Sequence, residues 1–310
     1  MTRIGSSELD IFPLVFGGNV FRWTADEATS FALLDAFIDG GGTMVDTADG
    51  YSHWVPGNMG GESEAIIGGW LAARGCRDKV LIATKVGKHP DYPGLHPDII
   101  ARAVDASLAR LQTDHIDLYY AHYDDPSVPM AESVGALSAL VDAGKVRYIA
   151  PSNFTAERID EWFAVTKADG LHPAVALQPH YNLVERDFET NGLRDVAAKY
   201  DLGVLTYYSL ASGFLTGKYR PGSPVTGERA GRAASYLDGR GEAVLAGLDE
   251  ISAAHGVEPT SVALAWLRAQ PTVAAPIASA SRPEQLPALM ASATLELSEG
   301  EVAALSAITG

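Results

Sequence analysis

The fold is decided by FALLDAFIDGGG at residues 31–42 and by the apolar runs on either side of it, LVFGG at 14–18 and MVDTAD at 44–49. The first stretch places apolar side chains at every third or fourth position, which predicts an amphipathic helix, whereas the short flanking runs are typical of buried strands. Thr24 and Glu27 have the spacing of a capping box, so we expect the helix to begin near them and to end at the three glycines. Together the three segments predict one strand, helix, strand unit.

The same alternation continues along the rest of the chain. Six further apolar runs are expected to be strands, at residues 80–86, 116–121, 146–150, 174–178, 203–208 and 272–278. Helical patterns lie between them, and a closing helix is predicted at 299–308 with Ser298 and Glu301 as its capping pair. Eight strands that are apolar on both faces predict a parallel sheet covered by helices. We therefore expect a single (β/α)8 TIM barrel domain over residues 1–310, with its active site at the C-terminal face of the strands and a mobile loop at 218–241.

An open, doubly wound sheet is the alternative architecture for this pattern. That nucleotide-binding fold is expected to carry G-x-G-x-x-G after its first strand, and Gly17, Gly18 and Asn19 do not supply it. GFLTGK at 213–218 resembles a phosphate-binding P-loop, but it is one residue too short and is followed by Tyr219. The sequence therefore favours the closed barrel.

Charge and composition exclude several classes of function. The 310 residues include 23 basic and 39 acidic side chains, a net charge of −16, which argues against binding to nucleic acid or to an anionic membrane surface. No apolar run approaches the roughly 18 residues of a membrane span, and the first residues do not resemble a signal peptide. A single cysteine, Cys76, fits a reducing compartment. We expect a cytoplasmic protein, and a monomer.

Four polar residues interrupt the apolar pattern where predicted strands end: Asp46, Tyr51, Lys85 and His122. In a barrel these strand ends meet at one face, so the four side chains are expected to lie close together. An ammonium at the end of VLIATK is costly to bury without an anion, and Asp46 is the candidate partner. A tyrosine beside an ammonium has its pKa lowered and can give a proton to an oxygen on which negative charge develops. The pattern predicts a proton-donating site.

Other chemistries find less support. The remaining histidines and Cys76 show no metal-ligand spacing, so no metal site is expected, and G-x-S-x-G of the serine hydrolases is absent. An isomerase or aldolase that forms a Schiff base on Lys85 remains an alternative. It would not account for the motifs described next.

Several separated motifs resemble the aldo-keto reductase superfamily over nearly the whole chain. They are DGGGTMVDTADGYS (39–52), ATKVG (83–87), IDLYYAHYDDP (116–126), GKVRYIAPSNF (144–154), LASGFLTGKY (210–219) and SASRPEQL (279–286). The resemblance implies reversible reduction of an aldehyde or ketone by hydride from a nicotinamide cofactor. It also implies that Tyr51 is the general acid, that Lys85 lowers its pKa while paired with Asp46, and that His122 orients the carbonyl.

The same resemblance implies where the cofactor binds. Ser152, Asn153 and Gln178 match positions for the carboxamide, and Tyr207 matches the aromatic residue that stacks on the nicotinamide. The positions for the pyrophosphate are Ser209, Leu210, Gly213 and Lys218, and those for the adenosine phosphate are Ser281, Arg282 and Gln285. Because arginine suits a phosphate group, we predict NADPH over NADH. The sequence departs from the family pattern at Ser279, at Tyr208 and Ser209, and at Leu289, which replaces an asparagine that often contacts the adenine.

Aromatic residues in the loops after the strands are the candidates for substrate contact. We expect Trp23, Trp54 and Tyr123 to line the pocket, with Phe21 and Tyr92 as further candidates, and we favour an apolar or aromatic carbonyl compound. Sugars, hydroxysteroids, quinone-like compounds and small aldehydes stay open. The chain also resembles potassium-channel β-subunits, so an NADPH-binding regulatory subunit is the alternative function.

Overall fold

Eight short parallel strands make up the central sheet of the computed structural model, which describes residues 1–222 and 227–309. They are β3 (Val15–Gly17), β4 (Met44–Asp46), β5 (Leu81–Val86), β8 (Ile116–Ala121), β9 (Val146–Pro151), β10 (Ala176–Leu177), β11 (Gly203–Thr206) and β12 (Val273–Ala278). Two antiparallel hairpins lie outside this sheet: β1 (Thr2–Arg3) with β2 (Asp10–Ile11), and β6 (Lys88–His89) with β7 (Tyr92–Pro93). Seven of the eight barrel strands lie within the apolar runs predicted from the sequence, and β9 extends one residue beyond its run.

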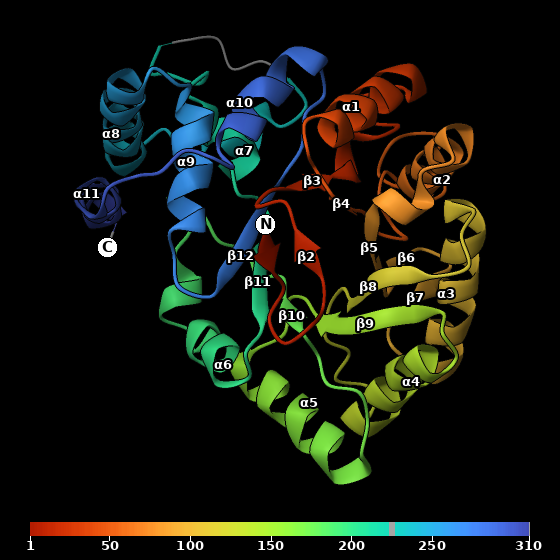
Figure 1. Cartoon of the computed structure of the whole chain (residues 1–310). Coiled ribbons are helices and arrows are strands. Elements are labelled where there is room, and N and C mark those ends of the chain that lie inside the picture. Colours follow the sequence, from red (N-terminus) through yellow and green to blue (C-terminus); the bar gives the residue numbers. More distant parts are fainter. Residues whose placement is uncertain (223–226, 310) are drawn as a thin grey trace.

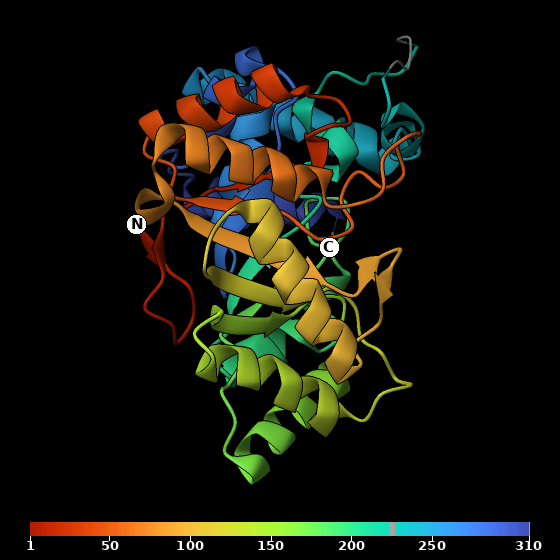
Figure 2. The same cartoon turned by 90° about the vertical axis from the view of Figure 1, so that its right-hand side faces the viewer.

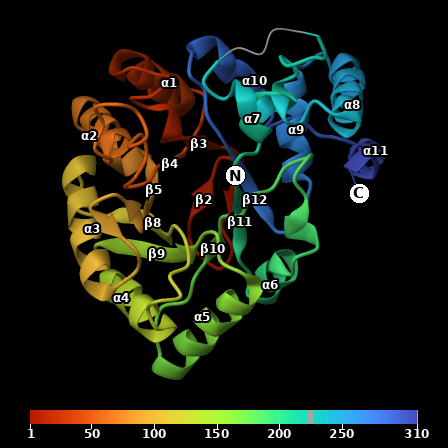
Figure 3. The ribbon, with the colours of Figure 1, turned by 180° about the vertical axis from the view of Figure 1, so that it is seen from behind.

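The sheet is rolled into a barrel with the strand order β10-β11-β12-β3-β4-β5-β8-β9. Isolated bridges from Ile149 to Ala174 and from Ser152 to Gln178 join the two end strands, so the ring is nearly closed. Helices surround the strands when the barrel is viewed from either end (Figure 1, Figure 3). The predicted (β/α)8 barrel is confirmed.

The outer layer consists of helices that follow the strands and pack on the sheet. The α-helices are α1 (Glu27–Asp39), α2 (Glu62–Arg74), α3 (Pro97–Leu111), α4 (Met130–Asp142), α5 (Ala156–Asp169), α6 (Leu193–Lys199), α7 (Ala230–Ala234), α8 (Gly239–His255), α9 (Pro259–Arg268), α10 (Leu286–Ala291) and α11 (Glu299–Thr309). Short 3-10 helices are η1 (Gly18–Val20), η2 (Arg77–Lys79), η3 (Asp187–Glu189), η4 (Ala211–Thr216) and η5 (Pro283–Gln285). The predicted closing helix corresponds to α11, and Ser298 and Glu301 form reciprocal hydrogen bonds at its start.

Apolar side chains form two cores, one inside the barrel and one between the strands and the helices. Alternation along each strand assigns neighbouring residues to opposite cores, so that Ala83 faces the interior and Ile82 the helices. The N-terminal hairpin adds Ile4, Leu9 and Ile11 to the interior core. This hairpin lies at one end of the barrel and the β6–β7 hairpin at the other (Figure 2).

One local prediction, the capping box of α1, is wrong, and another, the mobile loop, is not tested. The cap of α1 is Asp26, whose side chain accepts a hydrogen bond from the backbone of Thr29, and the predicted capping box at Thr24 is wrong because that hydroxyl contacts Ser281 instead. Residues 223–226 of the segment predicted to be a mobile loop, 218–241, lie outside the described residues. In the described part of this segment, α7 is present and α8 begins. Its mobility stays a prediction.

Candidate active site

A buried lysine lies at the centre of a polar cluster inside the C-terminal end of the barrel. Strand alternation places Lys85 on the interior face of β5, where its side chain is fully buried. Its Nζ atom lies 2.5 Å from Oδ1 of Asp46, 2.9 Å from the Tyr51 hydroxyl oxygen and 2.7 Å from the carbonyl oxygen of Thr47. All three ammonium protons therefore have acceptors, which is what permits a charge at this depth.

The charges of this cluster follow from burial and from its internal contacts. Burial acts to lower the pKa of Lys85, but Asp46 and Tyr51 outweigh it, so the pKa lies above its ordinary value. Burial raises the pKa of Tyr51, and Lys85 offsets only part of that rise. The prediction that Lys85 lowers the pKa of Tyr51 is correct for its own contribution, but the net pKa is raised. At neutral pH Lys85 is an ammonium and Tyr51 keeps its proton.

His122 follows β8 and completes the predicted set of four. Its ring centroid lies 6.1 Å from that of Tyr51. Burial, together with the charges of Lys85 and Lys88, holds the pKa of His122 well below its ordinary value, so the imidazole is neutral. Its Nδ1 atom is buried and has no hydrogen-bond partner within residues 1–222 and 227–309. A buried polar atom without a partner is a sign that a ligand completes the site.

The four residues predicted to hold a nicotinamide lie beside this cluster and are linked by hydrogen bonds. The side chain of Gln178 donates from Nε2 to Oδ2 of Asp46 at 2.9 Å. The backbone carbonyl oxygen of Gln178 accepts from the Ser152 hydroxyl at 2.9 Å. Asn153 contacts the Ser152 hydroxyl at 3.1 Å and accepts from the Tyr207 hydroxyl at 2.6 Å. The structure therefore brings Ser152, Asn153, Gln178 and Tyr207 together next to Asp46.

The predicted pyrophosphate residues lie before, within and after η4: Ser209 and Leu210 precede it, Gly213 is part of it and Lys218 follows it. Gly213 has a φ of +94°, and a Cβ atom there would lie 3.4 Å from Nζ of Lys218, so glycine leaves open space beside that ammonium. Leu210 is the residue before η4. The Ser209 hydroxyl is buried and donates to the carbonyl oxygen of Thr206, so its side chain is already engaged within the fold.

The predicted adenosine-phosphate residues lie at the start of η5, next to the loop after β3. Gln285 accepts hydrogen bonds from the backbone N–H groups of Ser281 and Arg282 at 2.8 and 3.2 Å. The Ser281 hydroxyl lies 2.6 Å from that of Thr24, and the Arg282 side chain is exposed. Leu289 is buried in the core. Gln285 thus acts here by shaping the backbone of the other two residues.

Aromatic side chains surround Tyr51 as the sequence predicts. Trp54 packs edge-on against Tyr51 with ring centroids 6.3 Å apart, and Trp23 packs edge-on against Trp54 at 5.5 Å. Tyr123 lies next to His122 at 5.2 Å. Trp54 and Tyr123 are 44% and 42% exposed, which makes them accessible to a ligand.

Two other aromatic candidates lie elsewhere. Phe21 is fully buried and stacks on Phe16, so it belongs to the core. Tyr92 packs on His89 in the β6–β7 hairpin. Neither makes a ring contact with Tyr51 among the contacts of the described chain.

Several polar residues near the cluster were not identified from the sequence. Asp49 is buried, its Oδ2 atom accepts from the backbone of Gly87 at 3.3 Å, and burial raises its pKa to about 8. Lys88, Arg229 and Arg232 place their charges on aromatic rings of this end of the barrel. The arginine content of the 218–241 segment is the one signal in the sequence, and it does not tell which way these side chains point.

The described residues also bear on two other kinds of site. No group of three or more histidine, cysteine or carboxylate side chains there is arranged as metal ligands. Within the same residues, no helix is long and apolar enough to cross a membrane. The absence of a metal stays a prediction.

The fold and the cluster define a barrel protein with a buried, hydrogen-bonded group of Asp46, Tyr51 and Lys85 at the C-terminal ends of its strands. The model of the aldo/keto reductase family matches residues 13–309. The chain is 32% identical to Protein tas of Escherichia coli over 99% of this chain and 96% of that protein, and 33% identical to aldo-keto reductase YhdN of Bacillus subtilis over 93% and 85%. It is 31% identical to a probable voltage-gated potassium channel subunit beta of rice, Oryza sativa, over 92% and 88%. The chain belongs to the aldo/keto reductase family of oxidoreductases.

Proposed function

We propose that this chain is an NADPH-dependent reductase that converts an aldehyde or ketone to the alcohol, with Tyr51 as the general acid. The hydrogen bond between Lys85 and Tyr51 carries the proposal. An ammonium has no acceptor, so Lys85 is the donor and the Tyr51 oxygen is the acceptor. The tyrosine's own proton is therefore left available for a third atom, the oxygen of a bound carbonyl.

The surrounding residues suit this proton transfer. When Tyr51 gives up its proton, the ammonium of Lys85 stabilises the phenolate, and Asp46 keeps Lys85 charged. Neutral His122 has a ring N–H group to donate to the same carbonyl oxygen and so to orient it. A bound nicotinamide cofactor supplies the hydride for the carbonyl carbon. Atoms balance: one hydride reaches carbon and one proton reaches oxygen.

The residues present fit such a cofactor along its whole length. Ser152, Asn153, Gln178 and Tyr207 would hold the carboxamide and the ring. Ser209 and Leu210, through their backbone, with Gly213 and Lys218, would hold the pyrophosphate, since glycine leaves open space beside the ammonium. Ser281, Arg282 and Gln285 would hold the phosphate of the adenosine.

The exposed Arg282 guanidinium supports the preference for NADPH over NADH, because it can fork onto a phosphate that NADH lacks. Arg282→Ala should raise the Kd for NADPH by tenfold or more and leave that for NADH nearly unchanged. An unchanged ratio of the two constants would show that this residue does not select the cofactor.

The experiment that tests the function is NADPH consumption with a panel of aromatic and aliphatic aldehydes and ketones, repeated with NADH. We expect turnover by the wild type and a loss of at least about 100-fold in Tyr51→Phe, with NADPH binding retained. Turnover that survives in Tyr51→Phe would remove the tyrosine from the role of acid. Failure of the wild type to bind either cofactor would overturn the proposal.

A regulatory subunit is the second candidate, favoured by the identity to the rice potassium channel subunit beta. That function would show itself as tight NADPH binding without turnover of any carbonyl compound. We propose that the chain works as a monomer with a small carbonyl compound as its partner, without nucleic acid or membrane. Sedimentation tests this, and a stable dimer or tetramer would contradict it.

A further inference from the structure

Three cationic side chains lie over aromatic rings near Tyr51 at the C-terminal end of the barrel. Two of them, on Arg229 and Arg232, come from α7 and the residue before it, and the third comes from β6. The pairs are Lys88 on Tyr123 at 4.0 Å, Arg232 on Tyr208 at 4.2 Å and Arg229 on Trp23 at 4.8 Å, each measured to the ring centroid. These three charges lie outside the buried cluster of Asp46, Lys85 and Tyr51, and they can interact with a group that binds next to it.

The rings connect these cations to the proposed acid. Trp23 contacts Trp54, which contacts Tyr51. On another side, Tyr123 contacts His122, which contacts Tyr51. Two side chains therefore separate Arg229 from Tyr51, and two separate Lys88 from Tyr51.

Tyr208 completes the ring of contacts. It packs edge-on against Tyr207 with centroids 5.3 Å apart. Arg232 lies over the Tyr208 ring, whereas Lys88 lies over the Tyr123 ring. The two cations therefore come from α7 and from β6 onto two different rings.

None of the three cations forms an ion pair with a carboxylate in the described part of the chain. Although the sequence has 39 acidic side chains, no ion pair joins one of them to Lys88, Arg229 or Arg232 among residues 1–222 and 227–309. Glu185 accepts from the hydroxyl of Tyr236, and Arg232 also interacts with that hydroxyl, so Arg232 is linked to Glu185 only through Tyr236. In the same residues, the buried Nη2 atom of Arg229 has no hydrogen-bond partner. A buried guanidinium donor without an acceptor indicates that an oxyanion reaches this place.

We propose that these cations bind an anionic group of the substrate, so that the preferred substrate is a carbonyl compound that also carries a carboxylate. The proposal rests on the proposed reductase function and specifies its substrate class. The carbonyl lies at Tyr51 and His122, and the carboxylate lies on the side of Tyr123 and Tyr208, where Lys88 and Arg232 supply the cations, with Arg229 on the side of the tryptophans. The aromatic rings hold the part of the molecule between the two groups.

The local cations also explain how an anion reaches a chain of net charge −16. At physiological salt the repulsion from distant carboxylates is screened beyond about 8 Å, so the nearby cations decide the potential near Tyr51. The preference for the anion should therefore weaken as salt is added.

The test compares 4-carboxybenzaldehyde with methyl 4-formylbenzoate, a neutral ester of nearly the same shape. We expect kcat/KM for the anion to exceed that for the ester by at least tenfold in the wild type. Lys88→Met and Arg232→Met should each reduce this ratio several-fold, and the double variant should bring it near one. Because both substrates are measured on the same preparation, a loss of folding or of cofactor binding cancels in the ratio.

Lys199→Met is the matched control. Lys199 also lies against a ring, that of Tyr200, but at the far end of α6, and it should leave the ratio unchanged. Arg229→Met is measured twice, as the substrate ratio and as the Kd for NADPH. A change in the ratio at constant Kd assigns Arg229 to the substrate anion. A weaker NADPH affinity at an unchanged ratio would assign it to a cofactor phosphate and remove it from the proposal.

A binding measurement separates this inference from the proposed function. Quenching of tryptophan fluorescence by 4-carboxybenzyl alcohol and by its methyl ester needs no turnover, and Trp23 and Trp54 are the reporters. Tighter binding of the anion, lost in Lys88→Met with Arg232→Met, would support the anion site even if no carbonyl were reduced. Equal turnover and equal binding of anion and ester would overturn the anion site and leave the reductase intact.

Discussion

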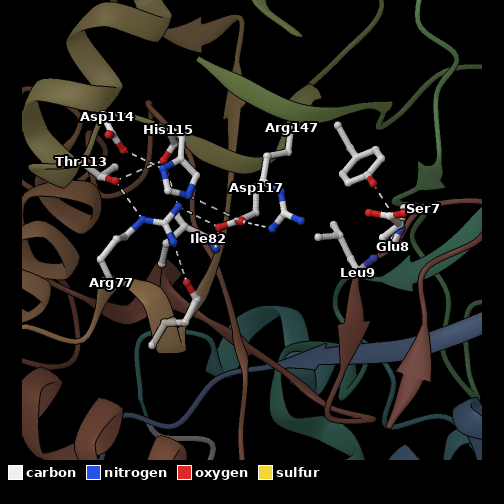
Figure 4. A network of polar contacts seen from close by, with 12 residues as sticks. Ser7, Glu8, Leu9, Arg77, Ile82, Thr113, Asp114, His115, Asp117 and Arg147 are labelled. Carbon is white, nitrogen blue, oxygen red and sulfur yellow. Dashed lines mark hydrogen bonds and ion pairs between the residues drawn. The ribbon is translucent and has the colours of Figure 1, made fainter. Parts of the chain in front are cut away.

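Two buried aspartates of the same barrel, Asp117 and Asp46, lie in opposite kinds of surroundings. Asp117, near the N-terminal end of β8, accepts from Arg77 and from the backbone of Ile82 at 2.8 Å through Oδ2, and from Arg147 at 2.9 Å through Oδ1 (Figure 4). Each of its oxygens has a donor. Both oxygens of Asp46 also accept hydrogen bonds, from Lys85 and from Gln178. However, Lys85 also donates to the Tyr51 oxygen, so the hydroxyl proton of Tyr51 points away from this cluster.

The two ends of the barrel therefore use buried charge differently. Around Asp117 both carboxylate oxygens have donors from within the protein, and these hydrogen bonds join η2, β5, β8 and β9. At the C-terminal end, Asp49 Oδ1, His122 Nδ1 and Arg229 Nη2 are buried without partners among the described residues. A closed network stabilises the fold, whereas an incomplete one marks the place where a ligand supplies the missing partners.

The sharpest test of this difference is removal of the charged pair at the C-terminal end. Lys85→Met with Asp46→Asn replaces an ion pair by neutral side chains of similar size and keeps an acceptor for Gln178. We expect turnover to fall by about 1,000-fold or more because the phenolate of Tyr51 is no longer stabilised. The free energy of unfolding should stay within about 1 kcal/mol, since a neutral replacement avoids the cost of burying two ions.

Urea denaturation and steady-state kinetics measure the two effects on the same preparation. Lys85→Met alone is the contrasting variant, because it leaves Asp46 buried without its cation and should be less stable than the double variant. A double variant that loses several kcal/mol of stability would show that this pair, like Asp117, holds the fold.

Asp117→Ala should give the reverse result. It leaves Arg77, which is mostly buried, without its carboxylate, so we expect the free energy of unfolding to fall by about 3 kcal/mol while kcat is unchanged. Asp114→Ala removes a neighbouring but exposed carboxylate and should cost less than about 0.5 kcal/mol. Loss of kcat in folded Asp117→Ala would mean that the two ends are coupled.

The comparison also shows what could be predicted from the sequence. Strand positions and the cluster of Asp46, Tyr51 and Lys85 follow from local patterns, because apolar runs mark the strands and the polar residues at their ends must meet in a barrel. The cap of α1 could not be predicted, since Thr24 is drawn to Ser281, which is far away in the chain. The sign of the Tyr51 pKa shift depends on burial, which no motif reports.

The three cations near Tyr51 were missed for a related reason. Arg229 and Arg232 come from α7 and the residue before it, a short segment without a periodic pattern, and Lys88 comes from a two-residue strand outside the barrel. Sequence reasoning therefore gave the chemistry of the site and not its charged rim.

The smallest expected effect concerns Asp49, whose incompletely bonded carboxyl group lies beside the backbone of Gly87. Its pKa is raised from an ordinary 3.8 to about 8. Between these values the folded state holds a proton that the unfolded state has lost, so stability falls as the pH rises from about 4 to about 8. An asparagine side chain cannot ionise, so the Asp49→Asn variant should be free of this loss. Relative to the wild type, the free energy of unfolding of this variant should rise by about 2 kcal/mol between pH 5 and pH 8. A single proton can change it by at most about 4 kcal/mol over three pH units.

Urea denaturation at several pH values measures this gain, with Asp125→Asn as the control. Hydrogen bonds from Ser127 and from the backbone of Leu95 hold the pKa of Asp125 below its ordinary value. Its stabilising effect is therefore present above that range and is lost only as the pH falls below it, so its difference from the wild type should be constant from pH 5 to pH 8. If Asp49→Asn were equally constant, the Asp49 carboxyl group would be ionised at neutral pH. Its unbonded oxygen would then be satisfied by a partner such as water, and the contrast with Asp117 would no longer extend to this residue.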